Sequence, residues 1–97
     1  MKKTRIAYRE IPTTSPKGRS QGFVAITLNA PSKNDKRGWA CSYQIVFPNR
    51  KVDRTIYGAD SLQALMLGLE GMQAEVVAAE LSREVALDWQ GSKFKIS

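Results

Sequence analysis

Few side chains in this sequence could do chemistry, and the most suggestive pair stands where a helix is predicted to begin. Asp60 and Ser61 place a carboxylate beside a hydroxyl, and the N-terminus of a helix attracts anions. An aspartate at this position also caps a helix, because its side chain accepts hydrogen bonds from free amides of the first turn. Capping accounts for both residue types without a substrate, so we interpret the pair as a helix start.

The sequence lacks the residue types that most catalytic and metal sites require. It contains no histidine and a single cysteine, which excludes Ser-His and Cys-His nucleophile pairs, imidazole ligands and cysteine-rich zinc sites. Neither a P-loop nor a G-x-G-x-x-G motif occurs. Cys41 lies on the apolar side of a predicted strand, so we interpret it as a small buried hydrophobe rather than a reactive thiol. We therefore predict a protein that is not an enzyme and that needs no metal or cofactor.

The composition predicts one soluble domain over residues 1–97. Hydrophobic residues make up 42% of the chain and charged residues 25%, which is ordinary for a globular domain. No apolar run reaches the roughly 20 residues that a membrane-spanning helix needs. Arg5, Arg9 and Glu10 interrupt any apolar core of a signal peptide, and a single cysteine suits a reducing compartment. These features predict a cytoplasmic protein without a membrane segment.

Alternation of apolar and polar residues predicts the element order β-β-β-β-α-β. The clearest strand is 39–47, whose odd-numbered residues are apolar or aromatic and form its packed face. The other predicted strands are 5–11, 23–29, 52–57 and 84–90, and the polar segments 12–22 and 31–38 are predicted connections. Short polar connections favour antiparallel hairpins. We predict an α+β two-layer sandwich, in which one long helix covers one face of a mostly antiparallel sheet of four or five strands. The position of the last strand stays open.

The helix is predicted over residues 61–82, with Asp60 as its N-cap and Gln63 in a capping-box-like position. Apolar residues at spacings of three and four define the face expected on the sheet. These residues are Leu62, Leu65, Leu69, Met72, Val76 and Ala79. No histidine joins the acids of this region, so we interpret them as a solvated stripe rather than metal ligands. They are Glu70, Glu75, Glu80 and Glu84.

Two motifs resemble those of a family of small uncharacterised bacterial domains. Residues 39–45 (W-A-C-S-Y-Q-I) match a strand of the W-x-C-x-Y-x-I kind, and residues 57–65 (Y-G-A-D-S-L-Q-A-L) match a G-x-D-S-x-Q-A-L helix start. The similarity also includes the strand with Arg9 and the strand from Val24 to Pro31, so it covers most of the chain. The resemblance implies a fold and a bacterial origin, and it implies no activity.

Small residues repeat along the predicted helix. They are Ala64, Gly68, Gly71, Ala74 and Ala78. A glycine inside a helix costs about 1 kcal/mol relative to alanine, so close packing should offset the two glycines. One explanation is close approach of the helix to its own sheet. The alternative is packing against the helix of a second copy, which would give a homodimer.

Basic residues concentrate in the first part of the chain. Residues 1–60 hold twelve Lys/Arg and four Asp/Glu, a balance of +8, whereas residues 61–97 have a balance of −2. The candidate contacts for an anion or a nucleic acid are Lys17, Arg19, Lys33, Lys36, Arg37, Arg50, Lys51 and Arg54. Alternate loops of a meander lie at opposite ends of the sheet, so we expect two patches rather than the continuous surface that nucleic-acid binding needs.

The sequence does not establish the biochemical function, but it ranks three functional classes of protein. The first is a small interaction or structural module that acts through an unknown protein partner. The second is a nucleic-acid-associated module that binds through the basic loops. An enzyme is the third and weakest, because the nucleophiles, bases and phosphate-binding motifs of common enzymes are missing.

Overall fold

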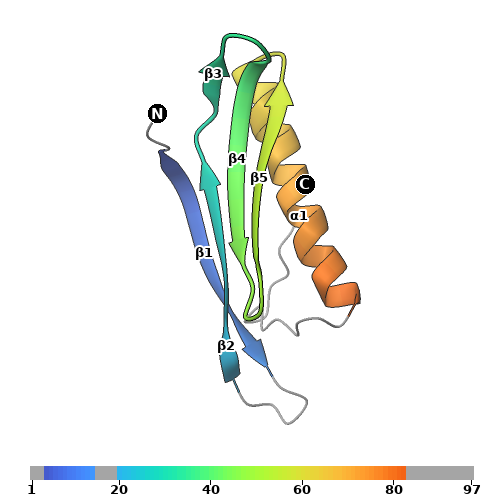
Figure 1. Cartoon of the computed structure of the whole chain (residues 1–97). Coiled ribbons are helices and arrows are strands. Elements are labelled where there is room, and N and C mark those ends of the chain that lie inside the picture. The colour runs from blue at the N-terminus through green and yellow to red at the C-terminus, as the bar shows by residue number, and fades with distance from the viewer. Residues whose placement is uncertain (1–3, 15–19, 83–97) are drawn as a thin grey trace.

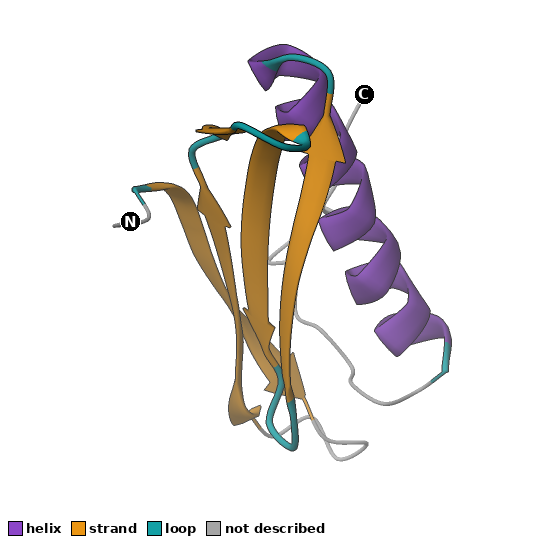
Figure 2. Cartoon of the chain, turned by 45° about the horizontal axis from the view of Figure 1, so that its top comes forward, coloured by secondary structure: helices purple, strands orange, loops and turns teal. Residues whose placement is uncertain are grey.

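The computed structural model describes residues 4–14 and 20–82, which form an antiparallel sheet and a long helix (Figure 1). The elements are β1 (Arg5–Thr14), β2 (Ser20–Asn29), β3 (Ser32–Asn34), β4 (Gly38–Val46), β5 (Lys51–Gly58) and α1 (Ser61–Leu81). The helix packs on one face of the sheet, mainly over β4 and β5, and no described element covers the opposite face (Figure 2). The predicted α+β fold is confirmed, and the predicted strand 84–90 lies outside the described residues.

Strand β4 is the centre of the sheet, because three other strands pair with it. β5 pairs antiparallel with β4 along one edge, from Trp39 to Val46. The other edge of β4 is shared, since β2 pairs with its second half and β3 with its first residues. Pro31 lies between β2 and β3 and has no amide hydrogen to donate to a ladder. The two strands therefore follow each other along the same edge, and β1 extends the sheet beyond β2.

The connections are shorter than the sequence predicted. The segment 31–38 was expected to be a turn throughout, which is wrong for β3. The side-chain oxygen of Asn34 accepts hydrogen bonds from the amides of Lys36 and Arg37, each at 3.0 Å, and this closes a tight turn. Gly38 follows with φ +87°, a conformation that L side chains rarely adopt. The connection 12–22 is also shorter than expected, because β1 continues to Thr14 and β2 begins at Ser20.

The helix side of the sheet forms the core, as the alternation in 39–47 predicted. Cys41, Tyr43, Ile45 and Phe47 are all buried, and Trp39 packs partly buried against them. The register places Ile45 between Ile26 of β2 and Val52 of β5, and side chains opposite each other in a sheet point to the same face. Both of those neighbours are buried as well. The core is thus a layer of strand side chains closed by α1.

The helix approaches β4 closely at two glycines. A Cβ atom on Gly68 would lie 2.8 Å from the Sγ atom of Cys41, and one on Gly71 would lie 3.1 Å from the hydroxyl oxygen of Tyr43. An added side chain at either position would require the side chain of Cys41 or Tyr43 to shift. Close approach of the helix to its own sheet therefore explains both glycines.

The helix face on the sheet differs from the predicted one. The buried residues are Ala64, Gly68, Met72, Val76 and Ala79. Leu65 and Leu69 are only partly buried, and Leu62 is 65% exposed, so its predicted place on the sheet is wrong. With 3.6 residues per turn, the helix is rotated by roughly 50° from the orientation that its largest side chains suggested. The small residues made that rotation favourable, because they let the helix axis come nearer to β4.

We predict that Gly68→Ala lowers the free energy of unfolding by about 1–3 kcal/mol, because the new methyl group overlaps Cys41. This cost should exceed the gain of about 1 kcal/mol in helix propensity. Urea denaturation measures the change, and Ala78→Gly on the exposed side measures propensity alone. In a Cys41→Ala background the same glycine substitution should cost less. Strict additivity of the two substitutions would contradict the contact.

Candidate functional site

Capping hydrogen bonds hold the start of the helix. The backbone amide of Gln63 donates to the Oδ1 atom of Asp60 at 2.7 Å, and the side-chain oxygen of Gln63 accepts from the amide of Ala59 at 2.6 Å. Asp60 is the N-cap, as predicted. The reciprocal bond reaches the residue before the cap rather than the cap itself. These hydrogen bonds account for the acid and the amide without a ligand.

Cys41 is a buried free cysteine, as predicted. Its Sγ atom lies 3.5 Å from the carbonyl oxygen of Asn29, and burial raises the pKa of the thiol. A thiol that is hard to ionise and has no access to solvent is a poor nucleophile. The residue belongs to the core.

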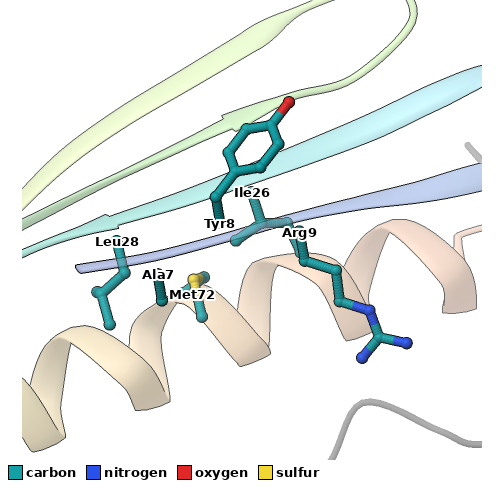
Figure 3. Close-up of a pocket in the computed structure, with 6 residues that line it drawn as sticks. All are labelled: Ala7, Tyr8, Arg9, Ile26, Leu28 and Met72. Carbon is teal, nitrogen blue, oxygen red and sulfur yellow. The ribbon is translucent and has the colours of Figure 1, made fainter. Parts of the chain in front are cut away.

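A small hollow lies between β1, β2 and the middle of α1 (Figure 3). Its lining residues are Ala7, Tyr8, Arg9, Ile26, Leu28 and Met72. Figure 3 shows the ring of Tyr8 pointing away from the helix and the side chain of Arg9 extending on the helix side of β1. The hollow measures about 70 Å³, whereas sites for small molecules usually exceed about 300 Å³. Its size does not fit a substrate.

A polar cluster joins the helix to the sheet. The hydroxyl of Tyr43 donates to Glu75 at 2.5 Å, and a guanidinium nitrogen of Arg54 lies 3.7 Å from the other carboxylate oxygen. Burial raises the pKa of Tyr43 most, the hydrogen bond to Glu75 raises it further, and the charge of Arg54 acts in the opposite direction. Tyr43 therefore stays protonated at neutral pH. The cluster ties α1 to β4 and β5, and it engages Arg54, one of the candidate anion contacts.

The other basic candidates lie at two ends of the sheet. Lys33, Lys36 and Arg37 belong to the β3–β4 hairpin, and Arg50 and Lys51 lie at the opposite end, in the turn before β5 and at its start (Figure 1). The guanidinium of Arg37 stacks 5.1 Å from the ring centre of its neighbour Tyr57. In the part of the chain that the structure describes, these side chains do not form one continuous basic surface.

The basic residues in the turn before β5 and at its start also contact other side chains of the chain. Arg50 lies 4.3 Å from the ring centre of Phe47, and Lys51 forms an ion pair with Asp53 at 3.6 Å. The remaining two candidates, Lys17 and Arg19, are outside the described residues.

The outer side of α1 is the most unusual surface of the described structure. Among the described residues, ten large hydrophobic side chains are exposed, and five of them lie on this helix. They are Leu62, Met66, Leu67, Val77 and Leu81. The small-residue set is divided, because Ala64, Gly68 and Gly71 lie toward the sheet whereas Ala74 and Ala78 are exposed beside these hydrophobic residues.

Sequence reasoning missed this surface, although it left a signal. Residues 61–81 contain three glutamates and no lysine or arginine, and their apolar residues surround the helix instead of following one stripe. A helix that covers one face of a sheet normally keeps a polar outer face. More hydrophobic residues than one face can bury indicate a second contact surface.

Fold and surface together define a class of protein: a small α+β domain with one helix-covered sheet and an apolar outer helix face. The chain belongs to the family DUF6968, a domain of unknown function, whose model matches residues 9–96. This confirms the resemblance to a family of uncharacterised domains. No curated protein and no solved structure matches the chain. Among the described residues, no helix combines the length and the apolar character that crossing a membrane requires.

We predict that the free energy of unfolding falls as the pH rises above about 10, where a tyrosine ionises in an unfolded chain. Folded Tyr43 keeps its proton there, so the native state binds more protons than the unfolded state and loses stability. Tyr43→Phe should make this fall shallower in urea titrations between about pH 8 and 11. Tyr57→Phe is the control, because that side chain is exposed on the other face of the sheet. An unchanged slope in the Tyr43 variant would contradict the buried hydrogen bond.

We also predict that nucleic acid binds weakly and only at low salt, because each end of the sheet offers few cations. Titration of labelled single- and double-stranded oligonucleotides at two salt concentrations measures this. Binding that persists at moderate salt would require a continuous basic surface and would place the nucleic-acid class first.

Proposed function

We propose that this chain is a protein-interaction module that docks an apolar partner surface on the outer side of α1 and catalyses no reaction. The observation that carries the proposal is the concentration of exposed hydrophobic residues on one helix. Five exposed side chains leave on the order of 500 Å² of residue surface in water, as much as the largest patch of a typical monomer, and such patches often bind partners.

Burial of this surface would supply the free energy of binding. Removal of apolar surface from water contributes about 25 cal/mol per Å² before the costs of association. Leu62 and Leu81 stand at the two ends of the helix, and Met66 and Val77 lie between them. The helix therefore offers apolar contacts along its whole length, which suits a partner that is itself a helix.

The remaining exposed hydrophobic residues support this choice of surface. The other five lie on four different strands, and arginine side chains stack on two of them, Tyr8 and Tyr57. The middle of the uncovered sheet face is polar, with a hydrogen bond from Gln44 to Asp53. Exposed hydrophobic side chains on separate strands, some of them partly covered, are common on soluble proteins.

Two sequence features support a non-catalytic role and a cytoplasmic location. The chain has no histidine, and its single thiol is buried at Cys41. A lone buried cysteine is typical of proteins from reducing compartments.

The proposal predicts where a partner can be captured. A photo-crosslinking residue, p-benzoylphenylalanine, is introduced at Val77 of α1 or at Val46 of the uncovered sheet face, two valines with 39% and 38% exposure. Irradiation in the native host should give protein adducts at Val77 and few at Val46. Circular dichroism and thermal melting establish that both variants fold. Equal adduct yields at the two positions, or none at Val77, would contradict docking through the helix.

A further inference from the structure

The outer side of α1 carries a pattern of apolar and polar residues that reads the same in both directions along the helix. Four apolar side chains flank two central polar ones, at spacings of four, four, three, four and four residues. We call this set the outer stripe, and it consists of Leu62, Met66, Glu70, Gln73, Val77 and Leu81. At 3.6 residues per turn, the six positions fall within roughly 100° of the helix circumference. The stripe therefore forms one surface, away from the line that packs on the sheet.

From this symmetry we infer that the partner is a second copy of the chain, with the two α1 helices packed antiparallel. The inference rests on the proposed function, and it names the partner of the same surface. A two-fold axis between Gly71 and Met72 places Leu62 opposite Leu81 of the second copy and Met66 opposite Val77. A two-fold interface needs a surface that complements itself in this way.

The exposure of the apolar members leaves them free to make these contacts. The exposed fractions are 65% for Leu62, 52% for Met66, 39% for Val77 and 79% for Leu81. Each apolar residue would meet another apolar residue across the axis, so no hydrophobic side chain would face a charge. Among antiparallel pairs, the same helix offers no second register in which all four are matched.

The polar centre of the stripe is complementary as well. Glu70 is its only charged residue, and the axis places it opposite Gln73 of the second copy. The amide of a glutamine donates hydrogen bonds, and a carboxylate accepts them. An antiparallel pair also brings the positive start of each helix near the negative end of the other. A parallel pair would instead place the two Glu70 carboxylates together.

The size of the surface predicts a weak dimer. Two patches on the order of 500 Å² each give about 1,000 Å² of buried surface, near the lower limit for a specific interface. We therefore expect a dissociation constant in the micromolar range, so that monomer and dimer coexist at concentrations that sedimentation can measure.

A matched pair of substitutions at one position tests the register. Gln73→Lys would place a cation opposite Glu70 of the second copy at two symmetric contacts, and Gln73→Glu would place an anion there. In analytical ultracentrifugation the lysine variant should bind itself roughly three- to tenfold more tightly than the wild type, and the glutamate variant correspondingly more weakly. Thermal melting controls for changes in the fold. Equal effects of both variants on dimerisation would overturn the register.

Disulfide crosslinking tests the orientation. Leu62→Cys and Leu81→Cys are made as separate proteins and oxidised alone or mixed, while the buried Cys41 is common to both. Crosslinked dimer should form only in the mixture, because each new thiol faces the other in an antiparallel pair. Dimer from each variant alone would indicate a parallel pair and overturn the inference, and so would an absence of crosslinks with a monomeric wild type.

The crosslinking at Val77 separates this inference from the proposed function. Adducts between two copies of the chain support both. Adducts with a different protein, together with a monomeric chain at high micromolar concentration, support the interaction module and overturn the homodimer. Adducts only within one chain, to residues 83–97, would show that the chain covers its own helix and would overturn both.

Discussion

The contact between Gly68 and Cys41 is the constraint on which the rest of this structure depends. Because position 68 has no side chain, the helix approaches β4 until its backbone meets the thiol, and Gly71 repeats the approach one turn later at Tyr43. Larger residues close the interface further along, where Met72 and Val76 are buried. The cost of glycine inside a helix is thus offset by packing at close range. With the small residues facing inward, the large residues Leu62, Met66 and Leu67 face outward, and this produces the exposed apolar side.

The polar interactions across the same interface act together with this packing. Glu75 accepts the hydroxyl of Tyr43 and pairs with Arg54, so one carboxylate connects the helix to two neighbouring strands. A buried hydroxyl without a partner would destabilise the fold, and an acceptor on the helix removes that penalty. A hydrogen bond is directional, whereas apolar contacts are not. The helix is therefore fixed in rotation as well as in distance, which keeps its outer residues in a constant position.

Much of the fold could be predicted from the sequence because it follows from local patterns. Strict alternation in 39–47 placed Cys41 and Ile45 in the core, and Asp60 marked the helix start. The face of the helix could not be predicted in the same way. A periodic pattern shows where apolar residues lie, but α1 has apolar residues on several sides, and the choice depends on the shape of β4. Strand β3 was missed for another reason, because the Asn34 side chain closes the turn early. The candidate site followed the helix orientation, so it could not be predicted before that orientation was known.

The position of Cys41 has a consequence for how the interface can be observed. Its sulfur lies beneath Gly68, with α1 above it and the sheet around it. No reagent can reach that sulfur while the helix is in place. Reaction of the thiol must therefore wait for α1 to lift from β4, and its rate depends on how often that opening occurs. The chain thus contains its own probe of local unfolding, at the point where the helix and the sheet are closest.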